Sequence, residues 1–347
     1  MKNITIIGGS DGFGKWLANF IKKSFKNEVE ITITGRNLEK LKKIAKEINC
    51  LYSNDNINGI KNADIVIFAV PIGHTEEIIK NVAPKIKKDT VILDVTSIKS
   101  GPSIAMKKYS PKGVLIIPTH PMFGPYVSTI AGQIFVLTPK DEDKKDKRYI
   151  FLKNFLEKND AKVIETTPIE HDKMMAVVQG LTHFDMFVLG ETIKRLGLDI
   201  EKSMNFVSPI YKIMISSVAR YLNQNPKLYS DIQIYNKEVL KVHKIFMETT
   251  NDFNNFIKNK DEINFIKTVK NTAEYFGKNT QQGQEYTDKI IYMIGNQIEK
   301  AHKNIGNQIE ITNIYDKTII KGILEKIENN FLFINKSKYN LNTWEIN

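Results

Sequence analysis

The stretch that decides the fold is "NITIIGGSDGFGKWL", residues 3–17. A β-branched run leads into a glycine-rich loop, and a helix-forming segment follows directly. Glycines at such a turn let the backbone approach a pyrophosphate, and the N-terminus of the next helix offers free N–H groups to it. The loop departs from the G-x-G-x-x-G pattern because Asp11 occupies the position of the second glycine. A tight turn without a ligand is the alternative. We expect a dinucleotide at this turn, held by Gly9, Ser10, Asp11, Gly12, Phe13 and Gly14.

Working outward from this turn, strands and helices alternate through residues 1–166. Helical spacing of apolar residues marks the segments "FGKWLANFIKKSF", "NLEKLKKIAKEI" and "HTEEIIKNVAPKI". Between them lie runs that predict strands: "NITIIGG", "VEITITG", "ADIVIFAVP", "DTVILDVTS", "GVLIIPTH" and "GQIFVLTP". This alternation predicts βαβ units and a Rossmann-like, doubly wound, mostly parallel sheet.

Three strand ends bear on the choice of cofactor. The second strand ends "TITGRN", with Arg36 and Asn37 where an enzyme that selects NAD usually has an acidic residue. Arg36 suits the 2′-phosphate of NADP, although it could also be a surface residue that caps the next helix. Asn37 could still bind the 2′-hydroxyl of NAD. We therefore expect NADP to be favoured over NAD. Two further strand ends, "AVP" and "DVTSIK", are expected to place Val70, Pro71 and Thr96 beside the cofactor.

A histidine fixed between prolines ends a later strand. His120 follows the run "GVLIIPT" and stands between Pro118 and Pro121. The carboxyl edge of an open α/β sheet is where ligands bind, and Ser97 is expected at the same edge. A neutral histidine there can accept a proton from a substrate hydroxyl while hydride leaves the same carbon. The alternative is a core histidine that donates to a carbonyl.

Residues 167–303 are almost entirely helical in pattern. In "EHDKMMAVVQGLTHF" the polar residues His171, Gln179 and His183 share a four-residue spacing with Met175. A second helix, "SPIYKIMISSVARYL", carries Lys212, Ser216 and Arg220 at the same spacing. Arg220 is a candidate to bind a carboxylate through its two parallel donors. On these patterns alone, packing against another helix and a structural salt bridge explain them equally well.

The charge, hydrophobicity and cysteine content of the sequence narrow the class of protein. The net charge is +11, but the lysines are mixed with acidic residues. This pattern indicates a solvated surface that attracts small anions, and it predicts no nucleic-acid site. The sequence has no apolar run of transmembrane length, and its N-terminus enters a predicted strand directly, so we expect no membrane segment, no secretory signal and a cytoplasmic protein. The single cysteine excludes an internal disulfide, and no metal cluster is expected.

The C-terminal residues 304–347 favour β-branched and aromatic side chains. We expect two or three antiparallel strands there, in a small extension that docks on the rest of the chain. The predicted domains are residues 1–166, 167–303 and 304–347.

Five segments in one order resemble the prephenate dehydrogenase family of tyrosine biosynthesis. The likeness covers residues 1 to about 300 and lies in "GGSDGFG", "DVTSIKS", "HPMFGP", "EHDKMMAVVQGLTHF" and "SPIYKIMISSVARYLNQNPKLYSDI". The last segment is similar to the dehydrogenase half of bifunctional chorismate mutase–prephenate dehydrogenases. The resemblance implies oxidative decarboxylation of prephenate to 4-hydroxyphenylpyruvate with NAD or NADP, and a homodimer through the helical domain.

The resemblance also implies roles for particular residues. His120 would be the catalytic histidine and Ser97 its assistant. His183 would bind substrate and Arg220 a carboxylate, with Gln179 and Lys212 as further candidates. Some members follow the histidine motif with Thr-Glu, whereas this chain has Pro125-Tyr126. No chorismate mutase segment is expected before Met1.

Three alternatives stay open on the sequence. One is an arogenate dehydrogenase, because the sequence does not decide between prephenate and arogenate as the substrate. A β-hydroxyacid dehydrogenase also joins a Rossmann domain to a helical dimer domain, but that architecture favours a lysine base. An NADP-sensing regulatory protein would keep the fold without turnover, and the complete set of catalytic residues argues against it.

Overall fold

The computed structural model describes residues 2–328 and 330–347. The chain forms two compact units, Met1–Thr250 and Asn251–Asn347. Each unit is described by itself. Within the described residues, no helix is both long enough and apolar enough to cross a membrane.

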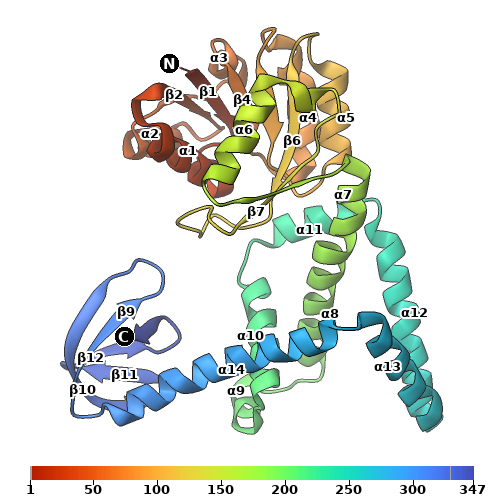
Figure 1. The fold of residues 1–347 in the computed structure, drawn as a ribbon, viewed down its shortest axis with the longest axis vertical. Helices are drawn as coiled ribbons and strands as arrows, with labels where there is room; N and C mark the ends of the chain where they lie inside the picture. Colours follow the sequence, from red (N-terminus) through yellow and green to blue (C-terminus); the bar gives the residue numbers. More distant parts are fainter. Residues whose placement is uncertain (1, 329) are drawn as a thin grey trace. The chain divides into compact units, whose positions relative to one another are not determined.

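The first unit begins with an eight-stranded sheet in the order β3-β2-β1-β4-β5-β6-β7-β8 (Figure 1). Neighbouring strands pair in parallel except β6 and β7, which are antiparallel. The order reverses between β1 and β4, as in doubly wound dinucleotide-binding folds. The six predicted strands are confirmed, whereas β3 and β8 are short edge strands that the sequence pattern did not reveal. The bounds are β1 Lys2–Ile7, β2 Val29–Thr34, β3 Leu51–Ser53, β4 Ile65–Phe68, β5 Val91–Asp94, β6 Leu115–Pro121, β7 Ile134–Leu137 and β8 Lys162–Glu165.

Helices cover both faces of this sheet and divide its apolar side chains into two cores. Because strand side chains alternate between faces, Ile6 and Ile7 of β1 belong to different cores. The core with Ile6 contains buried residues of α1 Gly12–Phe25, α2 Leu38–Ile48 and α6 Lys147–Lys158. The core with Ile7 contains those of α3 Asn56–Ile60, α4 Ile72–Val82 and α5 Ser100–Tyr109.

The helices that follow the sheet begin at clear sequence signals. Thr167, Ser208 and Asn225 each accept a hydrogen bond from a backbone N–H of the first turn, and each is followed by proline. A capping side chain with proline at the first helical position favours a helix start. The helices are α7 Pro168–Met175, a π-helix Ala176–Leu181, α8 Thr182–Arg195, α9 Ile200–Ser203, α10 Pro209–Leu222, α11 Pro226–Tyr235 and α12 Val239–Lys258.

The second unit joins two helices, α13 Glu262–Phe276 and α14 Asn279–Lys303, to a five-stranded antiparallel sheet. Ala301 of α14 belongs to the core of this sheet, and Gln297 accepts a hydrogen bond from Ile346 N at 2.9 Å. The extension therefore docks on α14. The strands, in spatial order, are β12 Ser337–Asn340, β11 Phe331–Ile334, β10 Ile319–Glu328, β9 Gln308–Asn313 and β13 Trp344–Ile346.

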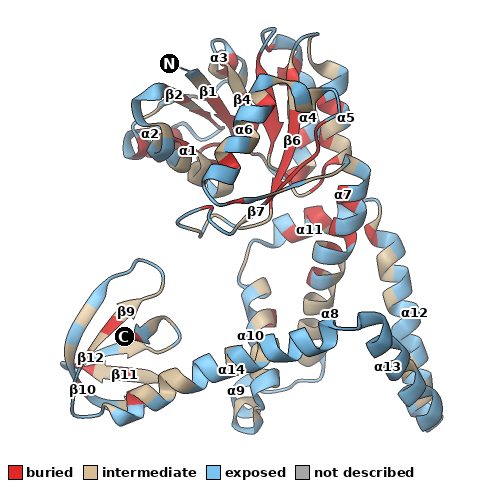
Figure 2. Cartoon of the chain, in the orientation of Figure 1, coloured by how far each residue is buried: buried red, intermediate tan, exposed pale blue. Residues whose placement is uncertain are grey.

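The predicted number of two or three strands in this extension was wrong. The two strands at the edges, "SKYN" and "WEI", are too short to show an alternating pattern. Figure 2 shows how differently the elements are buried: buried residues concentrate in the larger sheet, whereas α13 has none.

Candidate active site

The glycine turn between β1 and α1 has the geometry of a phosphate cradle. Gly8 has a φ of 90°, and both Gly8 N and Gly9 N donate to Thr34 O of β2, at 3.0 and 3.1 Å. A Cβ on Gly14 would lie 2.3 Å from Gly8 O, so only glycine lets α1 start this close to β1. A Cβ on Gly12 would meet nothing within 4 Å. The N-terminus of α1 thus faces open space, which fits the pyrophosphate of a dinucleotide.

The side chains around this turn are already engaged with one another. Asp11 caps α1 by accepting from Gly12 N at 2.8 Å, and it forms an ion pair with Lys40 of α2. The hydrogen bond from Lys40, followed by that from Gly12, lowers the pKa of Asp11. Ser10 lies close to Gly35, because a Cβ on Gly35 would be 2.9 Å from Ser10 Oγ. Lys40, which the sequence did not single out, therefore lies beside the nucleotide turn.

The other residues expected at the cofactor have mixed environments. Arg36 is exposed, whereas Asn37 accepts from Lys40 N at 2.9 Å and so caps α2. Val70 packs against Gly8. Pro71 is exposed and directly precedes α4.

Thr96 and Phe13 are placed by neighbouring side chains. Thr96 is buried, and its hydroxyl contacts Asp94 and donates to Ile98 O at 2.9 Å, so it holds the β5–α5 loop together. Phe13 packs on Phe123, with ring centroids 5.6 Å apart. This contact joins the nucleotide turn to the segment after His120.

His120 lies at the carboxyl end of β6, next to the end of β5, and is only 3% exposed. Its Nδ1 is 2.9 Å from Nε2 of His171 on α7. Nδ1 of His171 is 2.8 Å from Oδ1 of Asp172. Asp172 also accepts from the backbone N–H groups of Lys99 and Ser100, at 2.7 and 2.8 Å. The histidine at the sheet edge is thus fixed by a chain of side chains from a helix far along the sequence.

A buried ion pair lies beside this chain of histidines. Lys99 pairs with Asp94 at the end of β5 and donates to Thr119 O at 2.6 Å. Burial, followed by the nearby His171 and Lys99, holds the pKa of His120 well below its usual range. His120 is therefore neutral at pH 7, which is the form that can accept a proton.

Ser97 lies in the loop between β5 and α5 and is partly buried. This loop runs from the end of β5 to Lys99, so Ser97 is at the predicted edge of the sheet. No hydrogen bond joins its hydroxyl to His120 within the described residues. Its assisting role stays a prediction.

The π-helix between α7 and α8 keeps the polar stripe on one side. An α-helix completes a turn in 3.6 residues, so each residue four positions on lies slightly further around the helix axis than the last. A π-helix bonds residues five apart and has more residues in each turn, so the same spacing falls slightly short of a full turn and compensates for this rotation. The stripe consists of His171, Met175, Gln179 and His183. Three of the four are buried, and Gln179 is partly buried.

The stripe ends in an aromatic group with unused hydrogen-bonding capacity. The ring of His183 lies 5.2 Å from that of Tyr221 and 4.7 Å from that of Tyr229. Burial lowers the pKa of His183 to about 4. Within the described residues, His183 Nδ1 and Gln179 Oε1 are buried without a hydrogen-bond partner. Such atoms are rare in folded proteins, and they can bond to the polar groups of a ligand.

Arg220 and Lys212 both lie on α10, where Arg220 is exposed and Lys212 is partly buried. Burial and then Tyr221 raise the pKa of Tyr229 to about 12, whereas Arg220 opposes the shift and Tyr126 adds to it. Arg220 and Tyr126 are thus within electrostatic range of the group around His183. Tyr126 is 79% exposed and follows the strand that ends after His120.

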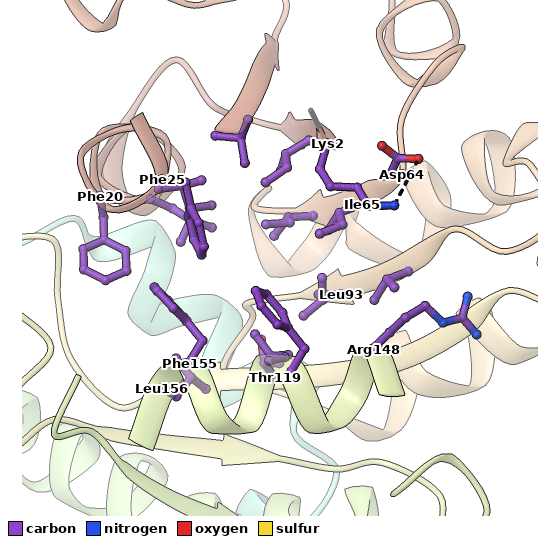
Figure 3. A pocket seen from close by; sticks show the side chains of 18 of the residues that line it. Lys2, Phe20, Phe25, Asp64, Ile65, Leu93, Thr119, Arg148, Phe155 and Leu156 are labelled. Atoms are coloured by element: carbon purple, nitrogen blue, oxygen red, sulfur yellow. Dashed lines mark ion pairs between the residues drawn. The ribbon is translucent and has the colours of Figure 1, made fainter. Parts of the chain in front are cut away.

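An apolar cavity lies on the face of the sheet opposite to the His120 side chain. It has a volume of about 490 Å³ and lies between α1, α6 and the strands, with Phe20, Leu93 and Phe155 around it (Figure 3). Thr119 lines it, as does Pro121. Because side chains alternate along a strand, the histidine between these two points to the opposite face. This apolar cavity is therefore not part of the site around His120.

Comparisons with known proteins decide the family. Residues 17–165 match the family "Prephenate dehydrogenase, nucleotide-binding domain", and residues 167–271 match "Prephenate dehydrogenase, dimerization domain". The "Probable arogenate/prephenate dehydrogenase" of Methanocaldococcus jannaschii is 42% identical over 97% of this chain and 76% of that protein. The chain belongs to the prephenate dehydrogenase family. It is an oxidoreductase with a Rossmann-type nucleotide-binding domain, and the β-hydroxyacid dehydrogenase alternative is excluded.

Further comparisons give the range of similarity of this prephenate dehydrogenase family member to other proteins. The "T-protein" of Haemophilus influenzae is 30% identical over 64% of this chain and 58% of that protein. The crystal structure of the Aquifex aeolicus prephenate dehydrogenase with hydroxyphenyl propionate and NAD+ has a TM-score of 0.62 and 21% identity, covering 80% of this chain and 98% of that one. The Synechocystis arogenate dehydrogenase has a TM-score of 0.59 and 17% identity, covering 82% and 99%. These structures share the fold.

Two contacts in this prephenate dehydrogenase family member are evident only in three dimensions. His171 shares the stripe of Gln179 and His183, but its contact with His120 spans 51 positions. Asp172 reaches Lys99 across 73 positions. Nothing in the sequence pattern signals either contact.

Proposed function

We propose that the protein is a prephenate dehydrogenase that converts prephenate to 4-hydroxyphenylpyruvate with loss of CO2. The observation that carries this is the placement of a neutral, buried His120 at the carboxyl edge of the sheet, one strand from the loop that holds Ser97. Its Nδ1 is engaged by His171, which leaves Nε2 for a substrate hydroxyl. When bound, an oxidised nicotinamide supplies the hydride acceptor.

The residues divide the remaining work between proton transfer and binding. His120 accepts the proton of the ring 4-hydroxyl while hydride leaves C4. CO2 then departs, and its bonding electrons complete the aromatic ring. Arg220 binds a carboxylate, and Lys212 adds positive charge on the same helix. His183 and Gln179 offer their unpartnered buried atoms to the substrate.

We propose NADP as the favoured cofactor. Support comes from two exposed cations, Arg36 directly after β2 and Lys40 on α2, and from the lack of an acidic residue at positions 35–37. The glycine turn, Val70, Pro71 and the Thr96 loop would hold the rest of the dinucleotide. NAD is the alternative, because Asn37 retains an amide that can reach a 2′-hydroxyl.

We also propose a cytoplasmic homodimer assembled through the helical domain. Exposed apolar side chains on the helices support this, among them Ile210, Leu222 and Leu240. The division into residues 1–166, 167–303 and 304–347 stays our working domain assignment. The particular likeness of residues 208–232 to the bifunctional enzymes also stays a prediction.

The substrate alternative is arogenate, a possibility kept open by the name of the Methanocaldococcus jannaschii relative. The test is to incubate the purified protein with prephenate or arogenate and with NADP+ or NAD+, and to follow reduced nicotinamide by absorbance. Turnover of prephenate with the higher kcat/KM supports the proposal. Higher kcat/KM for arogenate would replace the substrate, and nicotinamide binding without turnover of either would favour the sensor alternative.

A further inference from the structure

Asp172 is held so that it can only accept hydrogen bonds. It is 6% exposed, and its two oxygens receive the N–H groups of Lys99 and Ser100 in addition to the His171 ring. Burial raises the pKa of Asp172, but the hydrogen bonds from His171, Ser100 and Lys99 outweigh it and lower the pKa overall. Asp172 is therefore a carboxylate, and His171 must carry its proton on Nδ1.

The proton on Nδ1 of His171 determines which nitrogen of His120 carries a proton. Burial lowers the pKa of His171, with Asp172 only partly offsetting this, so the ring is neutral and its Nε2 has a lone pair. Two ring nitrogens 2.9 Å apart need one proton between them. His171 cannot supply it, so the proton belongs to Nδ1 of His120. The lone pair of His120 is then on Nε2.

We propose that His171 and Asp172 are positioning residues that hold His120 in the tautomer whose Nε2 accepts the substrate proton. This inference rests on the proposed function. A carboxylate that orients a histidine in this way maintains both the tautomer and the ring position. The proton passes from the substrate hydroxyl to Nε2, and no proton moves along the chain of side chains. The imidazolium that forms keeps its Nδ1–H bond to His171, with the charge of Asp172 behind it.

The first test compares two substitutions of His171. His171→Phe keeps a ring but removes the acceptor, whereas the amide oxygen of His171→Gln lies near the position of Nε2 and can accept. We expect the Phe variant to lower kcat by about 10–100-fold, the range for a group that orients a functional histidine from behind. His171→Gln should recover most of this loss. A Phe variant within a few-fold of wild type would overturn the proposal.

The pH profile separates positioning from a structural role. The groups that face the His120 ring are His171, Lys99 with its partner Asp94, and Asp172 behind His171. A charged His171 ring would repel the His120 imidazolium and lower its pKa, but the neutral ring accepts the Nδ1–H bond of that imidazolium. Loss of this acceptor therefore lowers the pKa of His120 further. The acidic limb of kcat/KM, where activity is lost as His120 becomes protonated, should then move to lower pH in His171→Phe. An unmoved limb together with a lowered Tm would indicate a structural contact only.

The second test determines the tautomer of His120 in the wild type directly. The chain has six histidines, so ¹⁵N-histidine NMR of the wild type can be assigned with His120→Asn and His171→Gln spectra. We expect a protonated Nδ1 and an unprotonated Nε2 on His120, and the reverse tautomer would overturn the proposal. Full activity of His120→Asn would instead overturn the proposed function, so the two failures can be told apart.

Discussion

Two regions of the site differ in how completely their buried polar atoms are hydrogen-bonded. One is the sheet edge around His120, and the other is the helical group around His183. Around His120, both nitrogens of His171 and both oxygens of Asp172 have hydrogen-bond partners, whereas Oδ1 of Asp94, in the neighbouring ion pair, is buried without one in the described residues. Around His183, Nδ1 of that ring and Oε1 of Gln179 are buried with none in the described part of the chain. A complete network holds a group in one state before the reaction. An incomplete one carries a desolvation cost that a ligand can relieve.

The difference indicates that the two halves of the site do different work. The sheet edge is arranged for proton transfer, so changes there should affect kcat. The helical group is arranged for binding, so changes there should affect substrate affinity and can even stabilise the free protein. The following variants test this division, beginning with the largest expected effect.

The strongest test is removal of the base. We expect His120→Asn to lower kcat by about 10²–10⁴-fold, the range for loss of a general base. Binding of NADP and prephenate should change little, because the substitution leaves the glycine turn and α10 untouched. Steady-state kinetics and equilibrium titrations measure both. A kcat within a few-fold of wild type would remove His120 from the mechanism.

Arg220→Ala tests the opposite half. Loss of a charge-assisted pair to a carboxylate should cost about 1.5–3 kcal/mol, or roughly 10–150-fold in substrate affinity. Arg195→Ala is a matched control, because that arginine is also exposed but pairs with Glu191 on α8. The control should keep wild-type affinity. If Arg220→Ala weakened cofactor binding as much as substrate binding, the assignment to a carboxylate would be wrong.

The sequence predicts these two halves unequally. His120 is found because a strand pattern ends at it, and His183 and Gln179 because their spacing marks one helix face. The contacts of His120 depend on α7 meeting β6, and no local pattern specifies such a meeting. The π-helix also has no sequence signal of its own here, although it preserves the stripe.

Local motifs can also carry two meanings at once. Asn37 fits a place beside a ribose and equally fits a helix cap, and the structure shows the cap. The hydroxyl of Thr96 is likewise occupied within its own loop. Sequence reasoning located both residues at the correct strand ends, but it could not show which bonds their side chains make.

A third variant separates binding from stability. Gln179→Met keeps the length of the side chain and removes the unpartnered Oε1. We expect the free enzyme to gain about 1 kcal/mol in the free energy of unfolding, because a desolvated polar atom is lost. Substrate affinity should fall roughly 2–10-fold, the value of one hydrogen bond. Gln284→Met, at an exposed position of α14, is the control for the substitution itself.

Denaturant unfolding with and without prephenate measures both effects. Opposite signs for stability and affinity are expected only where a polar group awaits a ligand. If Gln179→Met destabilised the free protein, the amide would have a structural partner, and the contrast between the two halves would disappear.

The smallest expected effect concerns Arg36 and the choice of cofactor, because Arg36 belongs to neither half of the site. Arg36 is exposed, and an ion pair in water contributes at most about 1 kcal/mol, so the preference for NADP over NAD should be roughly five-fold or less. Lys40 is already paired with Asp11, so its contribution to binding a 2′-phosphate is reduced. Arg36→Asp should reverse the ratio of kcat/KM for the two cofactors, because a carboxylate repels the 2′-phosphate and accepts from the 2′-hydroxyl. Raising the salt concentration should shrink the wild-type preference, since exposed charges are screened. A wild type that prefers NAD, or an unchanged ratio in Arg36→Asp, would show that Arg36 is a surface residue without a role in cofactor choice.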